Sequence, residues 1–152
     1  MSADDFGRIK NVEMIRGSRT LAGREIALGK IESLVHACQA TESPAGIRDI
    51  VIIGLLYMCG LQRAEVASLN VESYDAEEGI IKVIGKGNKE RLVLPDSGTR
   101  DVIADWLNVR GHFDAPLLLA ILKNGQIRYD NGRMSDQAIY DVTKRRAKHG
   151  WR

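Results

Sequence analysis

An apolar helical stretch that breaks at a glycine and restarts at once constrains the fold of this chain more than any other feature. Residues 55–69 read LLYMCGLQRAEVASL, an apolar run followed by a short amphipathic one. Gly60 favours the end of the first helix, because glycine readily adopts the left-handed conformation that closes helix C-termini. Gln62, Arg63 and Glu65 follow within about one turn. The break therefore places polar side chains at a helix end, and we expect the functional site at this corner.

Two helices are predicted before the corner. Between residues 26 and 38, apolar side chains recur at the three- and four-residue spacing of an amphipathic helix. Ser43 followed by Pro44 is typical of the start of the next helix, predicted over 45–59. That helix is apolar on most sides, so we expect it to be the buried central one, with Arg48 and Asp49 at its wetter start.

A β-hairpin is predicted after the corner. Residues 80–84 and 91–94 are rich in β-branched and aliphatic side chains and flank the segment GKGNKE. This segment lacks the spacing of a nucleotide-binding Walker A loop. Two readings of it stay open: a solvent-exposed turn whose glycines supply positive φ, or a mobile tip that brings Lys86 to a phosphate.

Two further helices, over 98–110 and 135–147, complete the predicted α+β fold, which is mostly helical with a small antiparallel sheet built on the hairpin at 80–94. The chain has 152 residues and 44% hydrophobic content, enough for one domain with a core. Residues 1–24 lack clear periodicity and are expected to form a linker or arm. The domain itself is expected over residues 25–152.

Charge and cysteine content narrow the class of protein. The net charge is only +2, but basic residues gather at 8–24, 82–91 and 144–148. This separation predicts a face for a polyanion, or else ordinary solvated surface. Cys38 and Cys59 lie in apolar helical patterns and indicate reduced thiols of a cytoplasmic protein. The longest apolar run is too short to span a bilayer, so no membrane partner is expected.

Three segments, read together, carry a family resemblance. They are GLQRAEV at 60–66, VIGKGNKERLVLP at 83–95 and MSDQAIY at 134–140. In this order and at these distances they resemble the catalytic domain of tyrosine recombinases, the family of phage integrases and Xer resolvases. The similarity covers nearly the whole chain from about residue 16. It implies the catalytic-domain fold of the DNA breaking-rejoining enzymes for residues 25–152.

The resemblance implies a transesterification on double-stranded DNA, in the integration and site-specific recombination of mobile genetic elements. In this family a tyrosine attacks the scissile phosphate and holds it as a phosphotyrosine. Two arginines stabilise the non-bridging oxygens, and a lysine on the hairpin protonates the departing sugar oxygen. No cofactor, metal or small-molecule substrate is expected, because the phosphodiester energy is kept in the covalent intermediate.

Carried onto this sequence, Lys86 matches the hairpin lysine and Glu65 matches the supporting acidic residue of the corner. Gln62 stands where the family has its first catalytic arginine. A neutral glutamine cannot form the charged fork, and we expect this to remove at least roughly 3 kcal/mol of transition-state stabilisation. Arg63 should face elsewhere, because neighbouring helical residues point about 100° apart. The basic residues expected to contact DNA are Arg63, Lys82, Lys89, Arg91, Lys144 and Arg145.

The resemblance also implies an incomplete site. The family's H-x-x-R box and its nucleophilic tyrosine are expected beyond the last predicted helix, so we interpret this chain as a truncated catalytic domain that cleaves no DNA alone. Its own tyrosines are interpreted as packing or surface residues: Tyr57, Tyr74, Tyr129 and Tyr140. Two functions stay open. The chain is either a recombinase fragment that acts within a longer chain, or a non-enzymatic remnant that binds DNA or associates with intact recombinase subunits. Missing helices should expose apolar surface on the central helix, so self-association is also expected.

Overall fold

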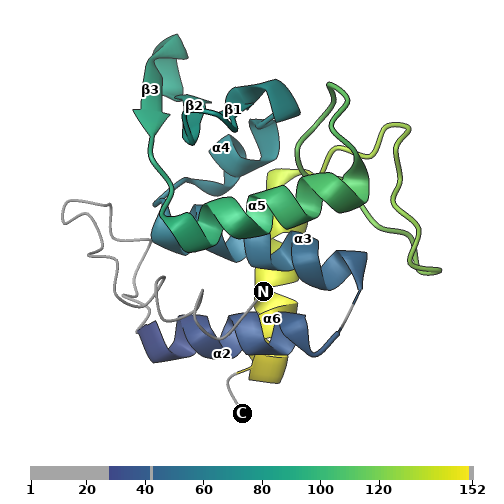
Figure 1. Ribbon diagram of the computed structural model, residues 1–152. Helices are drawn as coiled ribbons and strands as arrows, with labels where there is room; N and C mark the ends of the chain where they lie inside the picture. Colours follow the sequence, from purple (N-terminus) through teal and green to yellow (C-terminus); the bar gives the residue numbers. More distant parts are fainter. Residues whose placement is uncertain (1–27, 42, 151–152) are drawn as a thin grey trace.

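The computed structural model describes residues 28–41 and 43–150 as a mostly helical molecule with a small antiparallel sheet (Figure 1). The arm predicted at residues 1–24 lies outside the described residues. The sheet has the order β1 (Tyr74–Asp75), β2 (Ile80–Ile84), β3 (Glu90–Val93). The α-helices are α2 (Leu28–Gln39), α3 (Pro44–Ile53), α4 (Arg63–Ser68), α5 (Ser97–Arg110) and α6 (Asp136–Gly150). The predicted fold class is confirmed.

The central helix of the core is α3. It lies between α2 and α5, and α6 crosses it (Figure 1). Ser43 caps its start by accepting a hydrogen bond from the backbone N–H of Gly46 at 3.2 Å, and Pro44 occupies the first turn, as predicted. Ile50 and the three residues after it are at most 5% exposed. The expected exposed apolar surface on this helix is therefore absent from the described structure, because α2, α5 and α6 cover it.

The first residues of α3, Pro44 and Ala45, are only partly buried, but the prediction that Arg48 and Asp49 share this wetter start is wrong. Arg48 is 4% exposed and Asp49 is fully buried. Both side chains are accommodated in the core because they pair with each other and with groups from distant segments, as described below. Such partners cannot be predicted from the local apolar pattern, because they are far away in the sequence.

The α-helical part of the central helix ends earlier than predicted. From Gly54 to Met58 the chain forms a π-helical turn, η1 (Gly54–Met58), in which the N–H of Cys59 bonds to the carbonyl of Gly54 at 3.0 Å. Gly54 lets α5 approach closely, since a Cβ there would lie 3.1 Å from the side chain of Thr99. Gly60 then ends the helix with φ of 71°, as its position predicted.

The hairpin forms as predicted, and one face of it packs on the core. β2 and β3 pair antiparallel with Ile81 opposite Val93 and Val83 opposite Arg91. Ile81 and Val83 are fully buried, whereas the alternate residues face outward. The turn between the strands includes the short 3₁₀ segment η3 (Lys86–Asn88), where Gly87 has a positive φ.

The connection between α5 and α6 is irregular. It carries isolated β-bridges, Asn70 with Pro116, Leu119 with Arg133, and Ile121 with Ile127. Leu117 is buried, and its carbonyl accepts a hydrogen bond of 2.7 Å from Nε1 of Trp106. Trp106 is thus a core residue. Within the described residues, no helix is long and apolar enough to cross a membrane.

Candidate functional site

Gln62 is the residue at which the chain turns from the helix break into α4. It has extended backbone angles and forms the N-cap of that helix, and its N–H donates to Oε1 of Glu65 at 2.9 Å. The side chains of Gln62 and Arg63 are exposed, whereas Glu65 is only 5% exposed. The corner thus presents its first two polar side chains to solvent and keeps its carboxylate inside.

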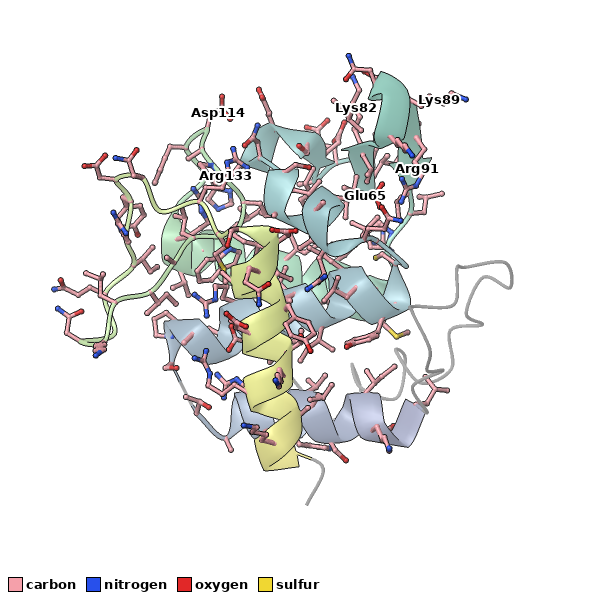
Figure 2. The ribbon with its side chains drawn as sticks, turned by 180° about the vertical axis from the view of Figure 1, so that it is seen from behind. Glu65, Lys82, Lys89, Arg91, Asp114 and Arg133 are labelled. Atoms are coloured by element: carbon pink, nitrogen blue, oxygen red, sulfur yellow. The ribbon has the colours of Figure 1, made fainter. Side chains whose placement is uncertain are left out.

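Glu65 binds the guanidinium of Arg91, and this pair joins α4 to strand β3 (Figure 2). Nη2 of Arg91 donates to Oε1 of Glu65 at 3.0 Å, and Nη1 donates to Oε2. The hydrogen bond to Glu65 raises the pKa of Arg91 above its ordinary value, although partial burial opposes this. Such bidentate pairs fix orientation as well as charge. Arg91, predicted to contact DNA, is therefore held at the corner.

The turn of the hairpin begins directly against this pair. A Cβ on Gly85 would lie 3.5 Å from Oε2 of Glu65 and 3.6 Å from Nη1 of Arg91. Lys86 is the next residue, and its side chain is exposed. The structure thus brings the backbone that carries Lys86 to the carboxylate that also binds the backbone of Gln62.

Arg63 turns away from the hairpin and contacts α6. Its Cζ lies 4.8 Å from the centre of the Tyr140 ring, and Nζ of Lys144 lies 5.9 Å from the same centre. Tyr140 is 41% exposed, so two cations flank an accessible aromatic ring. This arrangement agrees with the expectation that Arg63 does not take the direction of Gln62.

The other residues predicted to contact DNA lie on the surface. Lys82 and Lys89 belong to the hairpin, at the far end of the molecule from α2 (Figures 1 and 2). Lys82 pairs with Glu90 across the two strands at 3.2 Å, and both side chains are more than half exposed. Arg145 is exposed on α6. An exposed pair of this kind contributes little to stability, so Lys82 can exchange Glu90 for another anion.

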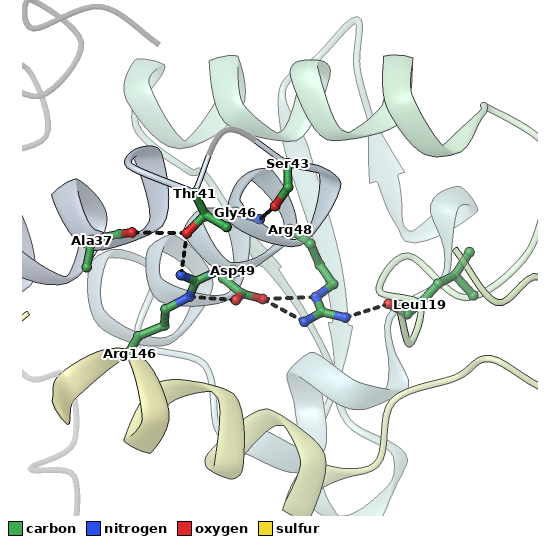
Figure 3. A network of polar contacts seen from close by, with 8 residues as sticks. All are labelled: Ala37, Thr41, Ser43, Gly46, Arg48, Asp49, Leu119 and Arg146. Carbon is green, nitrogen blue, oxygen red and sulfur yellow. Dashed lines mark hydrogen bonds and ion pairs between the residues drawn. The ribbon is translucent and has the colours of Figure 1, made fainter. Parts of the chain in front are cut away.

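The position of α6 depends on a buried charge network that the sequence analysis missed (Figure 3). Oδ1 of Asp49 accepts from Nε and Nη2 of Arg48, at 2.9 and 2.8 Å, and Oδ2 accepts from Nε of Arg146 at 2.8 Å. Nη1 of Arg146 also donates to the hydroxyl of Thr41 at 2.7 Å. Arg146 thus fastens α6 to α3 and is set apart from the neighbouring Lys144 and Arg145, which are exposed.

Arg133 is a second residue that sequence reasoning passed over. Its Nη1 donates to the carbonyl of Ala67 at 3.0 Å, at the end of α4, and its Nη2 bonds to the side chain of Asn70. The labelled side chain lies beside the segment that follows α4 (Figure 2). An arginine in an irregular connection gives no periodic signal, so only the fold reveals this contact.

The two cysteines are poor nucleophiles in this structure. Both are free, and burial raises the pKa of each thiol to about 12, although Arg146 partly opposes this at Cys38. Thiols with such pKa values stay protonated at neutral pH.

Comparison with known proteins agrees with this geometry. The sequence pattern of the phage integrase family matches residues 25–150. This chain belongs to the phage integrase family. The tyrosine recombinase XerC of Alcanivorax borkumensis is 33% identical to this family member over 132 residues, and XerD of Rickettsia conorii is 34% identical over 115 residues. XerC of Corynebacterium glutamicum is 26% identical over 149 residues, which are 97% of the chain.

This phage integrase family member spans less than half the length of these relatives. The matched region is 39% of the Alcanivorax protein, 45% of the Corynebacterium protein and 37% of the Rickettsia protein. In structure, the chain is similar to a crystal structure of XerA recombinase, with a TM-score of 0.63 and 16% sequence identity over 83% of this chain and 42% of that chain. The fold is thus that of a recombinase, over part of the recombinase length.

Proposed function

We propose that residues 25–152 form the DNA-binding front part of a tyrosine recombinase catalytic domain, which acts in DNA integration or recombination. One observation carries the proposal: the hairpin turn that begins at Lys86 lies against the Glu65–Arg91 pair, and Glu65 also binds the backbone of Gln62. A phosphate at this corner would meet the exposed Lys86 and Gln62 side chains together. Partners of this surface are then double-stranded DNA and other recombinase subunits.

In this proposal the residues have separate roles. Lys86 protonates the departing sugar oxygen, a role that suits a flexible amine on a turn. Glu65 orients the corner and holds Arg91, and Gln62 occupies the position of the first arginine without supplying its charge. Arg63 and Lys144, on either side of Tyr140, contact the DNA backbone, as do Lys82, Lys89 and Arg145.

The chain alone is proposed to cleave no DNA. Its tyrosines precede, in the sequence, the place that the family gives the nucleophile: Tyr57 and Tyr74 are partly buried, and Tyr129 and Tyr140 are exposed. The residues His149-Gly150-Trp151-Arg152 have the H-x-x-R spacing, but α6 extends to Gly150 and the side chains of these four residues lie outside the described residues.

The test joins this chain to the C-terminal segment of the Alcanivorax XerC and restores the arginine with Gln62→Arg. We expect the joined protein to form a covalent complex with a nicked suicide DNA substrate, and the unchanged Gln62 version to form it about a hundredfold more slowly or less. The Lys86→Ala version of the joined protein is the matched control. A folded joined protein with Gln62→Arg that forms no complex would contradict the proposal.

A second candidate function is a non-enzymatic remnant that binds DNA or associates with intact recombinase subunits. The neutral Gln62 at the decisive position favours it. It predicts that the two versions of the joined protein, with Gln62 and with Gln62→Arg, bind DNA with the same affinity, and that neither forms a covalent complex. The same experiment thus separates the two functions.

A further inference from the structure

A buried arginine at the end of α5 has half of its hydrogen-bonding edge unused. Arg110 is 1% exposed. Its Nη1 donates to the carbonyl of Gly111 at 2.7 Å and to that of Phe113 at 3.3 Å. Its Nε and Nη2 are buried and have no acceptor within hydrogen-bond distance in the part of the chain that the structure describes.

These two atoms form one edge of the guanidinium, which can donate two parallel hydrogen bonds to a carboxylate. The same protein shows this use at Arg48, whose Nε and Nη2 both donate to Asp49 while its Nη1 donates to the carbonyl of Leu119 at 3.0 Å (Figure 3). In both arginines Nη1 donates to backbone carbonyls. Arg48 also has a carboxylate on its Nε and Nη2, whereas Arg110 has none among the described residues. The missing component is therefore a bidentate anionic acceptor.

An unpaired buried guanidinium is unfavourable. Buried donors without acceptors are uncommon in proteins, and buried charges are normally paired. In agreement with this, burial lowers the pKa of Arg110, and Tyr129 opposes the shift only in part. A ligand that supplied an acceptor would relieve this penalty, so the site favours an anion over an empty state.

One of the side chains that cover the guanidinium is itself exposed. The Phe113 ring centre lies 4.7 Å from Cζ of Arg110, and Phe113 is 51% exposed. Gly111, with φ of 100°, makes room for the ring, since a Cβ there would lie 2.8 Å from it. On its outer side Phe113 contacts Tyr129, whose ring centre is 5.5 Å away and which is also 51% exposed.

We propose that Arg110 is the floor of a binding site for a carboxylate of a partner polypeptide, an aspartate or glutamate next to an apolar residue, which enters when the Phe113 ring moves aside. The aromatic rim of Phe113 and Tyr129 supplies the apolar contact. This site is independent of the DNA-binding corner: Asp114, on the same loop, lies well apart from Lys82 and Lys89 (Figure 2).

A carboxylate fits better than a nucleic-acid phosphate for two reasons. DNA backbones are bound by several cations together, whereas this site offers one buried fork edge. The residue after Phe113 is Asp114, an exposed acid that repels a polyanion more strongly than a single carboxylate.

The experiment follows the side-chain Nε–H signal of Arg110 by ¹⁵N NMR in the full chain. The probes are an acetylated, amidated Ala-Glu-Leu peptide and the matched Ala-Gln-Leu peptide. We expect the glutamate peptide to shift the signal until saturation and the glutamine peptide to leave it unchanged. Arg110→Lys identifies the signal by its loss and keeps the charge. Its affinity for the glutamate peptide, followed by the backbone amide signals of Gly111 and Phe113 in both proteins, should fall at least roughly tenfold, because a lysine cannot donate two parallel hydrogen bonds to one carboxylate.

Phe113→Ala keeps Arg110 and tests the site even where Arg110→Lys fails to fold. With no ring to displace, this variant should bind the glutamate peptide several-fold more tightly, whereas Tyr129→Ala should weaken binding through loss of the rim. Inorganic phosphate is titrated in parallel. The proposal is overturned if phosphate shifts the signal and the glutamate peptide does not, or if neither peptide shifts it in Phe113→Ala.

Discussion

At the scale of single residues, Glu65 decides how the corner is held together. It is a nearly buried carboxylate that receives the N–H of Gln62 and both Nη atoms of Arg91. Sequence reasoning placed Glu65 in a supporting role and Arg91 on the DNA surface, but it could not pair them, because 26 positions separate them in the chain. Because Glu65 binds both the Gln62 backbone and Arg91, the position of the hairpin and the geometry of the corner depend on each other.

Removing Arg91 should therefore affect stability more than removing Lys86. Arg91→Ala leaves the Glu65 carboxylate without its partner, and we expect a loss of about 2 kcal/mol, less than for a fully buried pair because the Arg91 side chain is 39% exposed. Lys86→Ala removes an exposed side chain and should change stability by less than about 0.5 kcal/mol. Urea unfolding followed by far-UV circular dichroism measures both. Equal losses would contradict the structural role of the pair.

The buried thiols predict a stability change at alkaline pH. Burial raises the pKa of Cys38 from 9.0 to about 12 in the folded state. Between these two values the unfolded thiol ionises and the folded one does not, so folding stability should be complete below pH 9 and should fall as pH rises toward 12. Urea midpoints of the wild type and of Cys38→Ala, measured across this range, check it: the variant should lose less stability than the wild type.

At pH 8, both cysteines should react with a disulfide reagent only as fast as the chain opens.

At the scale of elements, the contact between α3 and α6 rests on charge as well as on apolar packing. Asp49 lies between two arginines, one from its own helix and one from α6 (Figure 3). The burial of such a network is favourable only when every member is paired. The placement of α6, with Tyr140 and Lys144 on it, is thus linked to one buried aspartate.

Asp49→Asn should be among the most damaging single changes in the protein. It leaves the guanidinium groups of Arg48 and Arg146 without an anion, and we expect a loss of about 3–5 kcal/mol. Asp141→Asn, an exposed change on α6, is the matched control and should have little effect. Thermal unfolding measures the loss, and amide hydrogen exchange should show α6 opening first. Comparable stability of the two variants would rule out this role.

Most elements could be predicted from the sequence, because their signals are local. The spacing of Ile31, Leu34 and Cys38, the Ser43-Pro44 start and the alternation in 80–84 each specify a helix or strand on their own. The π turn could not be predicted, since a widened turn leaves the residues apolar on all sides. The Arg48–Asp49–Arg146 network and the contacts of Arg133 depend on tertiary folding. The roles of Lys86, Gln62 and the basic surface stay predictions that rest on the family resemblance.

At the scale of the whole molecule, the two most exposed large apolar side chains among the described residues lie at the hairpin and not on the central helix. Ile84 is 52% exposed, Leu92 is 68% exposed and Leu94 is 70% exposed. Ile84 and Leu92 lie on the outer side of a sheet whose other side packs on the core, and Leu94 follows directly after β3. An unpaired sheet edge with exposed leucines favours association between chains.

We therefore expect self-association at high protein concentration, through the hairpin. Analytical ultracentrifugation over a wide concentration range should show it, and Leu92→Lys combined with Leu94→Lys should reduce it. Val109→Lys, at an exposed apolar position on α5, is the control and should leave it unchanged. A monomer throughout the range would disprove the expectation.

DNA binding should depend on salt through the basic surface. Each phosphate contact contributes a slope of about −0.9 to the plot of log affinity against log salt concentration. Arg63→Gln and Lys89→Gln should each reduce the magnitude of the slope by about 1, without changing sequence preference. Lys30→Gln, on α2 at the opposite end of the molecule (Figure 1), should leave the slope unchanged. Fluorescence anisotropy of a labelled duplex at several salt concentrations measures all three, and equal slopes would refute this surface.

The π turn before Gly60 has a consequence for chain length. A π turn behaves as an α-helix that contains one residue too many, and each α-helical residue turns the chain by about 100°. Deleting one residue from 54–58 would let the helix continue as α with Gln62 and α4 facing nearly the same way, because the π turn takes up its extra residue by widening and not by turning the chain further. A single-codon deletion within this turn should thus leave the direction of the corner nearly unchanged, whereas the same deletion within α3, which is regular α-helix, would rotate the corner by about 100°.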